Sequence, residues 1–203
     1  TNCVINNVYN GIKIIGQSVK TTIRDNDIIC NSLLGVGGSV GVYIDSVFDY
    51  KPSGNTEHRP ENITVDNNLI YGFDRGCQYY RGLEGRIIHN DFDNSNVIGV
   101  EIISYDGNML VDDNWIAASA ATTSFVGIKV TAVGTPINNM ATISNNHLQG
   151  SKAKANSIGI HVVQNNVNVY SNTMKLFSDS DIKVETAGSV NIKENHCYSR
   201  GLS

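Results

Sequence analysis

Carboxylate side chains recur beside aromatic side chains in the middle of this sequence. Asp45 lies two residues after Tyr43. Asp74 lies shortly before Tyr80, and Glu101 follows in a later segment. A pair of carboxylates can hydrolyse a glycosidic bond at a separation of about 5–5.5 Å with retention of configuration, or about 6.5–9.5 Å with inversion. One carboxylate then acts as a general acid and the other as a base or nucleophile. We therefore predict that Glu101 forms a catalytic pair with Asp45 or Asp74.

The composition predicts the elements that must position these residues. The 203 residues include 26 Asn, 23 Ile and 20 Val but only 8 Leu and 3 Pro. β-Branched residues favour strands, and Asn and Gly favour turns, so a mostly helical protein is excluded. A hydrophobic fraction of 40% and a net charge of −4 exclude a disordered chain. No apolar run approaches the length of about 18 residues that a membrane span needs. The mild acidity argues against nucleic acid as a partner.

Two short motifs repeat along the chain, as expected for stacked structural units. The first is an Asn between apolar residues, h-x-x-N-x-h, and its copies centre on Asn7, Asn26, Asn67, Asn90, Asn114, Asn146, Asn172 and Asn195. The second, G-h-x-h, begins at Gly11, Gly41, Gly76, Gly99, Gly127 and Gly159, with a variant at Asp181. Short strands at a period near 23 residues are typical of a solenoid, in which each coil buries its apolar side against the next.

These repeats predict a single all-β solenoid domain over residues 1–203, which we expect to be a piece of a longer chain. A tight bend needs a residue that tolerates left-handed φ, so we expect the repeated Asn itself at the bend, with the Asn side chains stacked as a ladder. Eight coils at about 4.8 Å per strand spacing would form a rod roughly 38 Å long. Long insertions are expected near 29–40, 45–62 and 131–142, and insertions on one flank of a solenoid often mark its binding face.

Alternation along each G-h-x-h strand predicts which side chains point outward, because residues i and i+2 share a face. One outward column contains Lys13, Tyr43, Gln78, Glu101, Lys129, His161 and Lys183. The next contains Ile15, Asp45, Tyr80, Ile103, Thr131, Val163 and Glu185. The mixture of aromatic, amide and charged groups suits sugar binding, although a solvated sheet face explains any single position more simply. The predicted substrate-binding residues are Tyr43, Gln78, Tyr80, Arg81, Lys129 and His161.

The Asn series resembles the asparagine ladder of the right-handed parallel β-helix in the pectin-lyase-like superfamily. This resemblance covers almost the whole chain and implies that the Asn bend joins the second and third strands of each coil. The G-h-x-h strand would then be the first strand, whose outer face lines the substrate cleft in that superfamily. The coils also resemble the central domain of bacteriophage tailspikes. This implies a homotrimer on a phage virion tail, made in the host cytoplasm, that hydrolyses a bacterial surface polysaccharide. Outward apolar residues that could form trimer contacts are Ile15, Ile103, Phe125 and Val163.

Two other functions stay open at this point. A polysaccharide lyase or epimerase of the same superfamily would need a basic side chain, for which Lys129, His161 and Arg81 are the candidates. A non-catalytic adhesin or spike shaft, secreted or on a bacterial cell surface, would use the same face only for binding.

No metal or other cofactor is predicted. Asp66, His89, Asp91 and Asp113 fall near the bend on adjacent coils, but Asp is favoured there for turn hydrogen bonds alone. The cysteines follow no metal-binding spacing, and their apolar contexts predict buried free thiols. These cysteines are Cys3, Cys30, Cys77 and Cys197.

Overall fold

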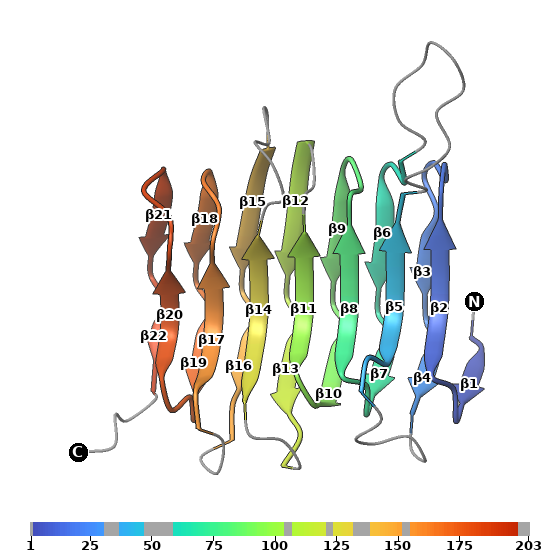
Figure 1. Cartoon of the computed structure of the whole chain (residues 1–203), viewed down its shortest axis with the longest axis horizontal. Coiled ribbons are helices and arrows are strands. Elements are labelled where there is room, and N and C mark those ends of the chain that lie inside the picture. Colours follow the sequence, from blue (N-terminus) through green and yellow to red (C-terminus); the bar gives the residue numbers. More distant parts are fainter. Residues whose placement is uncertain are drawn as a thin grey trace.

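The computed structural model describes residues 2–30, 37–46, 59–103, 107–120, 124–131, 139–151 and 155–198. These residues form 22 β-strands in three parallel sheets and no helix. The chain visits the three sheets in turn and then advances by one coil, so the molecule is a right-handed parallel β-helix (Figure 1). The predicted fold is confirmed. In the described part of the chain, no helix is long and apolar enough to cross a membrane.

We name the three sheets A, B and C. Sheet A contains β1 (Val4–Asn6), β4 (Asp27–Ile29), β7 (Leu69–Tyr71), β10 (Asp91–Ser95), β13 (Trp115–Ala118), β16 (His147–Gln149), β19 (Thr173–Lys175) and β22 (His196–Cys197). Sheet B contains β2 (Asn10–Ile15), β5 (Val40–Asp45), β8 (Arg75–Tyr80), β11 (Ile98–Ile103), β14 (Phe125–Thr131), β17 (Ser157–Val162) and β20 (Ser180–Val184). Sheet C contains β3 (Thr22–Arg24), β6 (Ile63–Asp66), β9 (Gly85–Ile88), β12 (Gly107–Asp112), β15 (Asn139–Ser144), β18 (Val167–Tyr170) and β21 (Val190–Lys193).

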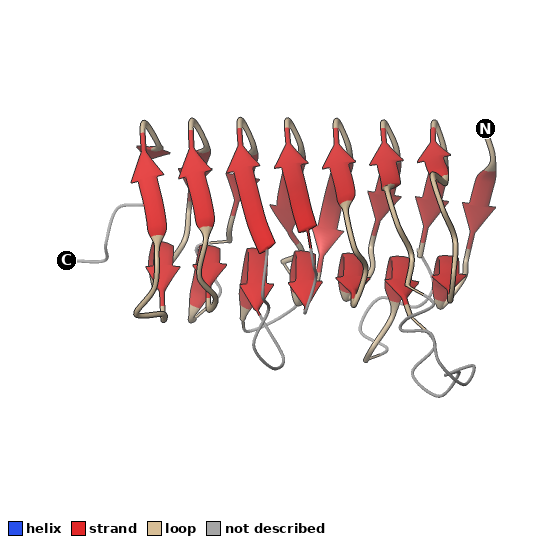
Figure 2. Cartoon of the chain, turned by 90° about the horizontal axis from the view of Figure 1, so that it is seen from above, coloured by secondary structure: helices blue, strands red, loops and turns tan. Residues whose placement is uncertain are grey.

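Figure 2 shows the strands of the sheets in separate layers along the rod. Apolar side chains fill the interior between the sheets. Each coil is too small to bury its apolar residues alone, so equivalent residues of successive coils stack into columns. β-Branched side chains suit such a pleated, stacked surface, which explains the excess of Ile and Val in the composition. One such column, in sheet A, consists of Ile28, Ile70, Phe92, Ile116, Leu148 and Met174.

The glycine of each G-h-x-h strand lies against the backbone of the next coil. A Cβ atom on Gly99 would lie 2.2 Å from Ile116 Cγ2 and 2.7 Å from the carbonyl oxygen of Gly127. Only glycine allows this close approach, so the glycine of the motif is a packing requirement. Asp181 replaces it in β20, the last strand of sheet B among the described residues. The other glycines in the same situation are Gly11, Gly41, Gly76, Gly127 and Gly159.

A ladder of buried Asn side chains runs along the bend between sheets C and A. Asn90 Nδ2 donates to Asn114 Oδ1 at 3.0 Å, and Asn114 Nδ2 donates to Asn146 Oδ1 at 2.9 Å. Each amide also donates to backbone carbonyls at the bend, so it ties the bends of neighbouring coils together. The bend joins the second and third strands of the coil, as predicted. The ladder consists of Asn26, Asn68, Asn90, Asn114, Asn146, Asn172 and Asn195.

Two members of the predicted ladder are wrong. Asn68, not Asn67, is the ladder residue of its coil, and Asn67 is exposed. In the first coil, Cys3 occupies the ladder position, because its backbone N–H donates to Asn26 Oδ1. Asn7 lies after β1 and has left-handed φ of 57°. Adjacent Asn residues satisfy the motif in either register, so the spacing alone did not distinguish them.

The prediction that the ladder Asn itself has left-handed φ is also wrong by one residue. The residue before each ladder Asn has positive φ, for example Asn67 at 53° and Asn145 at 54°. The left-handed residue is exposed or half-buried and turns the chain, whereas the following Asn points into the bend and bonds its carbonyls. Because solvent surrounds the turning residue, His, Ser and Glu also occupy that position in other coils.

Three further predictions need correction. Cys30 and Cys77 are buried free thiols, but Cys3 and Cys197 are exposed because they lie on the first and last coils. Phe125 is fully buried, so it points inward and cannot form a contact between subunits. Part of the predicted insertion 131–142 is strand, because β15 begins at residue 139. Residues 132–138 lie outside the described residues, as do 31–36 and 47–58 of the other two predicted insertions.

Candidate functional site

The predicted outward column on sheet B is confirmed by the strand register. Its members are Cα partners from coil to coil: Lys13, Tyr43, Gln78, Glu101, Lys129, His161 and Lys183. The next column is confirmed where Ile15 pairs with Asp45 and where Ile103 pairs with Tyr80 and Thr131. Most of the predicted site residues therefore share the outer face of sheet B.

Asp45 lies on this outer face, yet it is only 7% exposed. Arg81 Nε and Nη2 each donate to one of its carboxylate oxygens at 2.8 Å, which forms a bidentate ion pair. The Tyr43 hydroxyl donates to Asp45 Oδ2 at 2.6 Å. Burial, followed by this hydrogen bond, raises the pKa of Tyr43 to about 12, so Tyr43 is a neutral donor at neutral pH. Arg81 also lies over the Tyr80 ring, 4.3 Å from its centroid.

Glu101 is held in the same way and is 4% exposed. Arg75 Nε and Gln78 Nε2 each donate to Glu101 Oε2 at 2.9 Å. Lys129 Nζ lies 3.9 Å from Glu101 Oε1. Arg75 is not among the residues predicted from the sequence, because the G-h-x-h motif begins one residue after it. A cation directly before the glycine was the available signal.

Asp74 is a turn residue between sheets A and B. It is 5% exposed, and its carboxylate accepts hydrogen bonds from the Gly38 backbone N–H and from Asn96 Nδ2. Its carbonyl oxygen accepts the backbone N–H groups of Val97 and Ile98. These contacts tie adjacent coils together, and the structure does not bring the Asp74 carboxylate into contact with Glu101.

Asp45 and Glu101 lie two coils apart and bind different arginines. Asp45 is two coils and two residues away from Glu101, so strand spacings of about 4.8 Å and a rise of about 3.4 Å per residue place their Cα atoms about 12 Å apart. Each carboxylate is directed at its own arginine. On this face both acids bind donor groups, and both residues are buried.

The C-terminal end of this face carries another set of ion pairs. His161 Nε2 lies 3.1 Å from Glu185 Oε2, and Lys183 Nζ lies 2.8 Å from Glu185 Oε1. Hydrogen bonds from Lys183 and then His161 lower the pKa of Glu185. The predicted candidate bases Lys129 and His161 therefore each lie beside a carboxylate.

The acidic residues near the bend bind neighbouring side chains. Arg24 Nε donates to Asp66 Oδ2 at 2.8 Å, and His89 Nδ1 lies 2.9 Å from Asp66 Oδ1. Burial alone would raise the pKa of Asp66, but the hydrogen bonds with His89 and Arg24 outweigh it and lower that pKa overall. Within the described residues, no group of three or more His, Cys, Asp or Glu side chains is placed to hold a metal ion.

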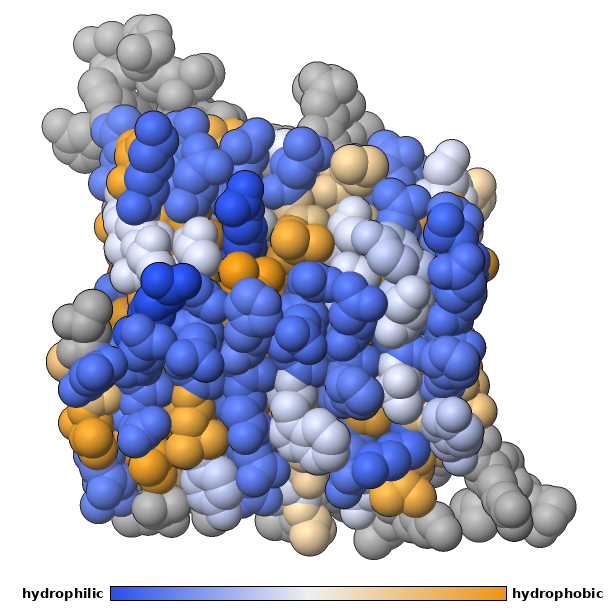
Figure 3. Space-filling view, turned by 180° about the vertical axis from the view of Figure 1, so that it is seen from behind, coloured by the Kyte–Doolittle hydropathy of each residue, from blue (hydrophilic) through white to orange (hydrophobic). Residues whose placement is uncertain are grey.

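The outer face of sheet C carries a hollow that the sequence analysis did not predict. It has a volume of about 600 Å³ and extends from Lys20 and Thr22 to Met140 and Thr142. A second hollow of about 570 Å³ begins at the same Met140 and continues over β18 and β21. We call the two together the sheet C trough. Sheet C occupies the upper half of the view in Figure 3, which shows apolar surface there between hydrophilic side chains.

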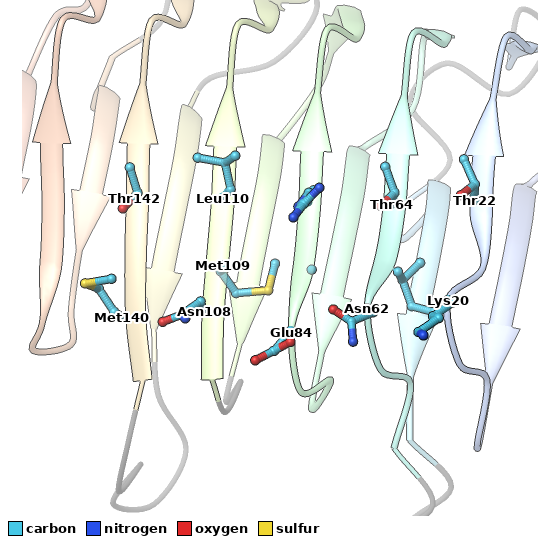
Figure 4. A pocket seen from close by; sticks show the side chains of 13 residues that line it. Lys20, Thr22, Asn62, Thr64, Glu84, Asn108, Met109, Leu110, Met140 and Thr142 are labelled. Atoms are coloured by element: carbon cyan, nitrogen blue, oxygen red, sulfur yellow. The ribbon is translucent and has the colours of Figure 1, made fainter.

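Two rows of side chains line the first hollow of the trough (Figure 4). The first row contains Thr22, Thr64, Arg86, Leu110 and Thr142, which are Cα partners from strand to strand. The second row contains Lys20, Asn62, Glu84, Asn108 and Met140. Register continues the first row to Asn168 and Asn191. The polar residues one and three positions before the apolar residue that opens each h-x-x-N motif were the available signal in the sequence, but the prediction considered only the G-h-x-h strands.

Comparisons with known proteins add little beyond the fold class. No protein-family model matches the chain, and no curated protein sequence is similar to it. Two solved structures of PfbA, a surface protein and adhesin of Streptococcus pneumoniae, are similar, with 11% and 12% identity and TM-scores of 0.43 and 0.40. The matches cover 96% and 97% of this chain but 66% and 62% of the PfbA chains, so this chain spans less than two thirds of their length. The sheet topology described above defines the fold.

Proposed function

We propose that this β-helix is a non-catalytic carbohydrate-binding rod, and that the outer face of sheet B contacts a bacterial surface polysaccharide. This differs from the hydrolysis that the sequence analysis favoured. The observation that carries the proposal is the burial of Asp45 and Glu101 beneath the donors that they orient.

The donors on this face keep part of their hydrogen-bonding capacity free for a ligand. Arg75 uses its Nε on Glu101, and Gln78 uses one amide N–H, so the Arg75 Nη groups and the Gln78 carbonyl have no partner among the described residues. The Tyr80 hydroxyl likewise has none there. Groups held in one orientation lose little conformational entropy on binding, which favours affinity for sugar hydroxyl groups.

The buried acids do not have the environment of a hydrolytic pair. A general acid must give its proton to the glycosidic oxygen, and the partner carboxylate must reach a water or the anomeric carbon. Each acid is instead covered by a guanidinium group and by an amide or phenol. The lyase alternative requires a basic side chain free to take a proton, but Arg81 is bound to Asp45 and Lys129 lies beside Glu101.

Binding to a panel of bacterial surface polysaccharides, measured by biolayer interferometry, tests the proposal. Arg75→Gln removes a charged donor, and hydrogen bonds of that kind contribute about 1.5–3 kcal/mol, so affinity should fall about 10- to 100-fold. Lys175→Gln is the control, because Lys175 is also a cation that lies against a neighbouring side chain, the Trp115 ring, but it is on sheet A. Unchanged binding by Arg75→Gln, or no binding by the wild-type protein, would contradict the proposal.

Mass spectrometry of the incubated polysaccharides separates binding from catalysis. The proposal predicts no cleavage. Products that gain one water per cut, and that disappear in Glu101→Gln and Asp45→Asn, would establish hydrolysis instead. Products with unsaturated ends would establish a lyase and direct attention to Lys129, His161 and Arg81.

The assembly and location expected from the sequence stay proposals of the same kind. We propose a homotrimer exposed on a phage tail or on a bacterial cell surface, because a rod that presents a polar binding face serves attachment in either setting. Ile15 of sheet B is 50% exposed, so its apolar side chain is available for a contact between subunits.

A further inference from the structure

We propose that the sheet C trough is a second, independent binding site, which takes an unbranched chain of 1,4-linked pyranose rings lying along the solenoid axis. This site does not depend on the sheet B proposal, because the two faces share no side chain. The shape of the trough, its unpaired polar groups and its repeat distance support this assignment.

The trough has the shape of a long, shallow channel along the rod. Its two hollows meet at Met140, and together they extend over the seven strands of sheet C from β3 to β21. Six strand spacings of about 4.8 Å give a length of about 29 Å. A channel of this length suits an extended polymer and is too long for a single small molecule.

The polar groups along the channel are free to bind. Arg86, Glu84, Asn62 and Asn108 line its first hollow, and their side chains make no hydrogen bond or ion pair with any described residue. On sheet B, by contrast, the buried carboxylates already occupy most of the donors around them. Sheet C therefore offers the larger unused hydrogen-bonding capacity of the two faces.

The chemistry of the lining matches a chain of hydroxyl groups. Hydroxyl and carboxamide side chains both donate and accept hydrogen bonds, as sugar hydroxyls do. Leu110 and Met140 supply apolar contacts for the C–H face of a pyranose ring, and methionine adapts to irregular shapes. Leu110 and Met140 lie on adjacent coils and each has a polar neighbour in the other row, whereas the coils of Thr22, Thr64 and Arg86 present polar side chains in both rows.

The repeat distance distinguishes the ligand from other extended polymers. The first row repeats at the strand spacing of about 4.8 Å, and 1,4-linked pyranose rings advance by nearly the same distance per ring. Each coil can therefore meet an equivalent ring. An extended peptide advances about 3.3 Å per residue and falls out of step within two coils. A nucleic acid would need a run of cations, whereas the lining of the first hollow has Lys20 and Arg86 as its cations together with the carboxylate of Glu84.

Isothermal titration with cello-, manno- and xylo-oligosaccharides of two to eight rings tests the proposal. We expect affinity for at least one series to rise with length and to level off at about six or seven rings, because the trough spans six strand spacings. A series that stops gaining affinity at two or three rings would refute a channel-long site. Absence of binding by all three series would also overturn the proposal.

Isosteric substitutions locate the binding on sheet C. Thr64→Val and Thr142→Val keep shape and strand propensity but remove hydroxyls, and each should weaken binding about 5-fold, the equivalent of one neutral hydrogen bond. Thr173→Val on sheet A is the matched control and should have no effect. Gln78→Ala on sheet B should also leave this binding unchanged. If Gln78→Ala loses binding while Thr64→Val and Thr142→Val bind as well as the wild-type protein, the sugar binds to sheet B and the second site is rejected.

Discussion

Replacement of one central Asn of the ladder should cost a large part of the stability of the molecule. Asn114 is 1% exposed. Its Nδ2 donates to the carbonyl oxygens of Ile87 at 2.9 Å and Asp112 at 3.0 Å, and to Asn146 Oδ1 at 2.9 Å. Its Oδ1 accepts the backbone N–H of Asn90 at 2.9 Å and its Nδ2 at 3.0 Å. Asn114→Ala removes all five contacts and leaves their partners buried.

The magnitude follows from these contacts. At about 1 kcal/mol for each hydrogen bond, the loss is about 5 kcal/mol. The free energy of unfolding of a whole domain is only about 5–15 kcal/mol. Asn195 at the C-terminal end donates to the carbonyl oxygens of Val169 and Lys193 and accepts the backbone N–H and Nδ2 of Asn172, but it is half-buried. Water can replace its lost partners, so Asn195→Ala should cost about 1–2 kcal/mol.

Urea unfolding followed by far-ultraviolet circular dichroism, with fluorescence of the single Trp115 as a second probe, measures both changes. We expect the free energy of unfolding to fall at least twice as far for Asn114→Ala as for Asn195→Ala. Equal losses at the two positions would refute the reasoning, because they would mean that burial does not set the cost of an orphaned amide partner. A loss below about 2 kcal/mol for Asn114→Ala would do the same.

Three further outcomes follow from the structure. Gly99→Ala should lower the melting temperature by several degrees, since the new Cβ meets backbone of the next coil, whereas Gly37→Ala, with open space around it, should not. The pKa of Asp66 is lowered in the folded protein, so its carboxylate contributes to folding stability above its usual pKa, and this contribution is lost as the pH falls through the folded-state pKa. Asp66→Asn should therefore be less stable than the wild-type protein at neutral pH, and the difference in stability should shrink in acid. Multi-angle light scattering should give a trimer mass, and a monodisperse monomer would reject the proposed assembly.

Much of the fold could be read from the sequence, because a solenoid repeats its local requirements in every coil. The glycine of the G-h-x-h motif recurs wherever a coil follows, and it is absent at Asp181 where none is described. Strict alternation fixed the outward column from Lys13 to Lys183. Where two Asn stood side by side, as at Asn67 and Asn68, only the register of the neighbouring coils decided which one joined the ladder.

The sequence by itself determined the architecture, the stacking of coils and the residues that share the face of sheet B. The tertiary structure alone decided what those residues do. Asp45 and Glu101 became buried because arginines from other coils lie against them, and Asp74 turned into a connection between coils. The sheet C trough likewise exists only when distant coils are in register. Local alternation specifies on which side a residue lies, whereas its exposure, partners and surrounding shape depend on side chains contributed from 20 to 40 residues away.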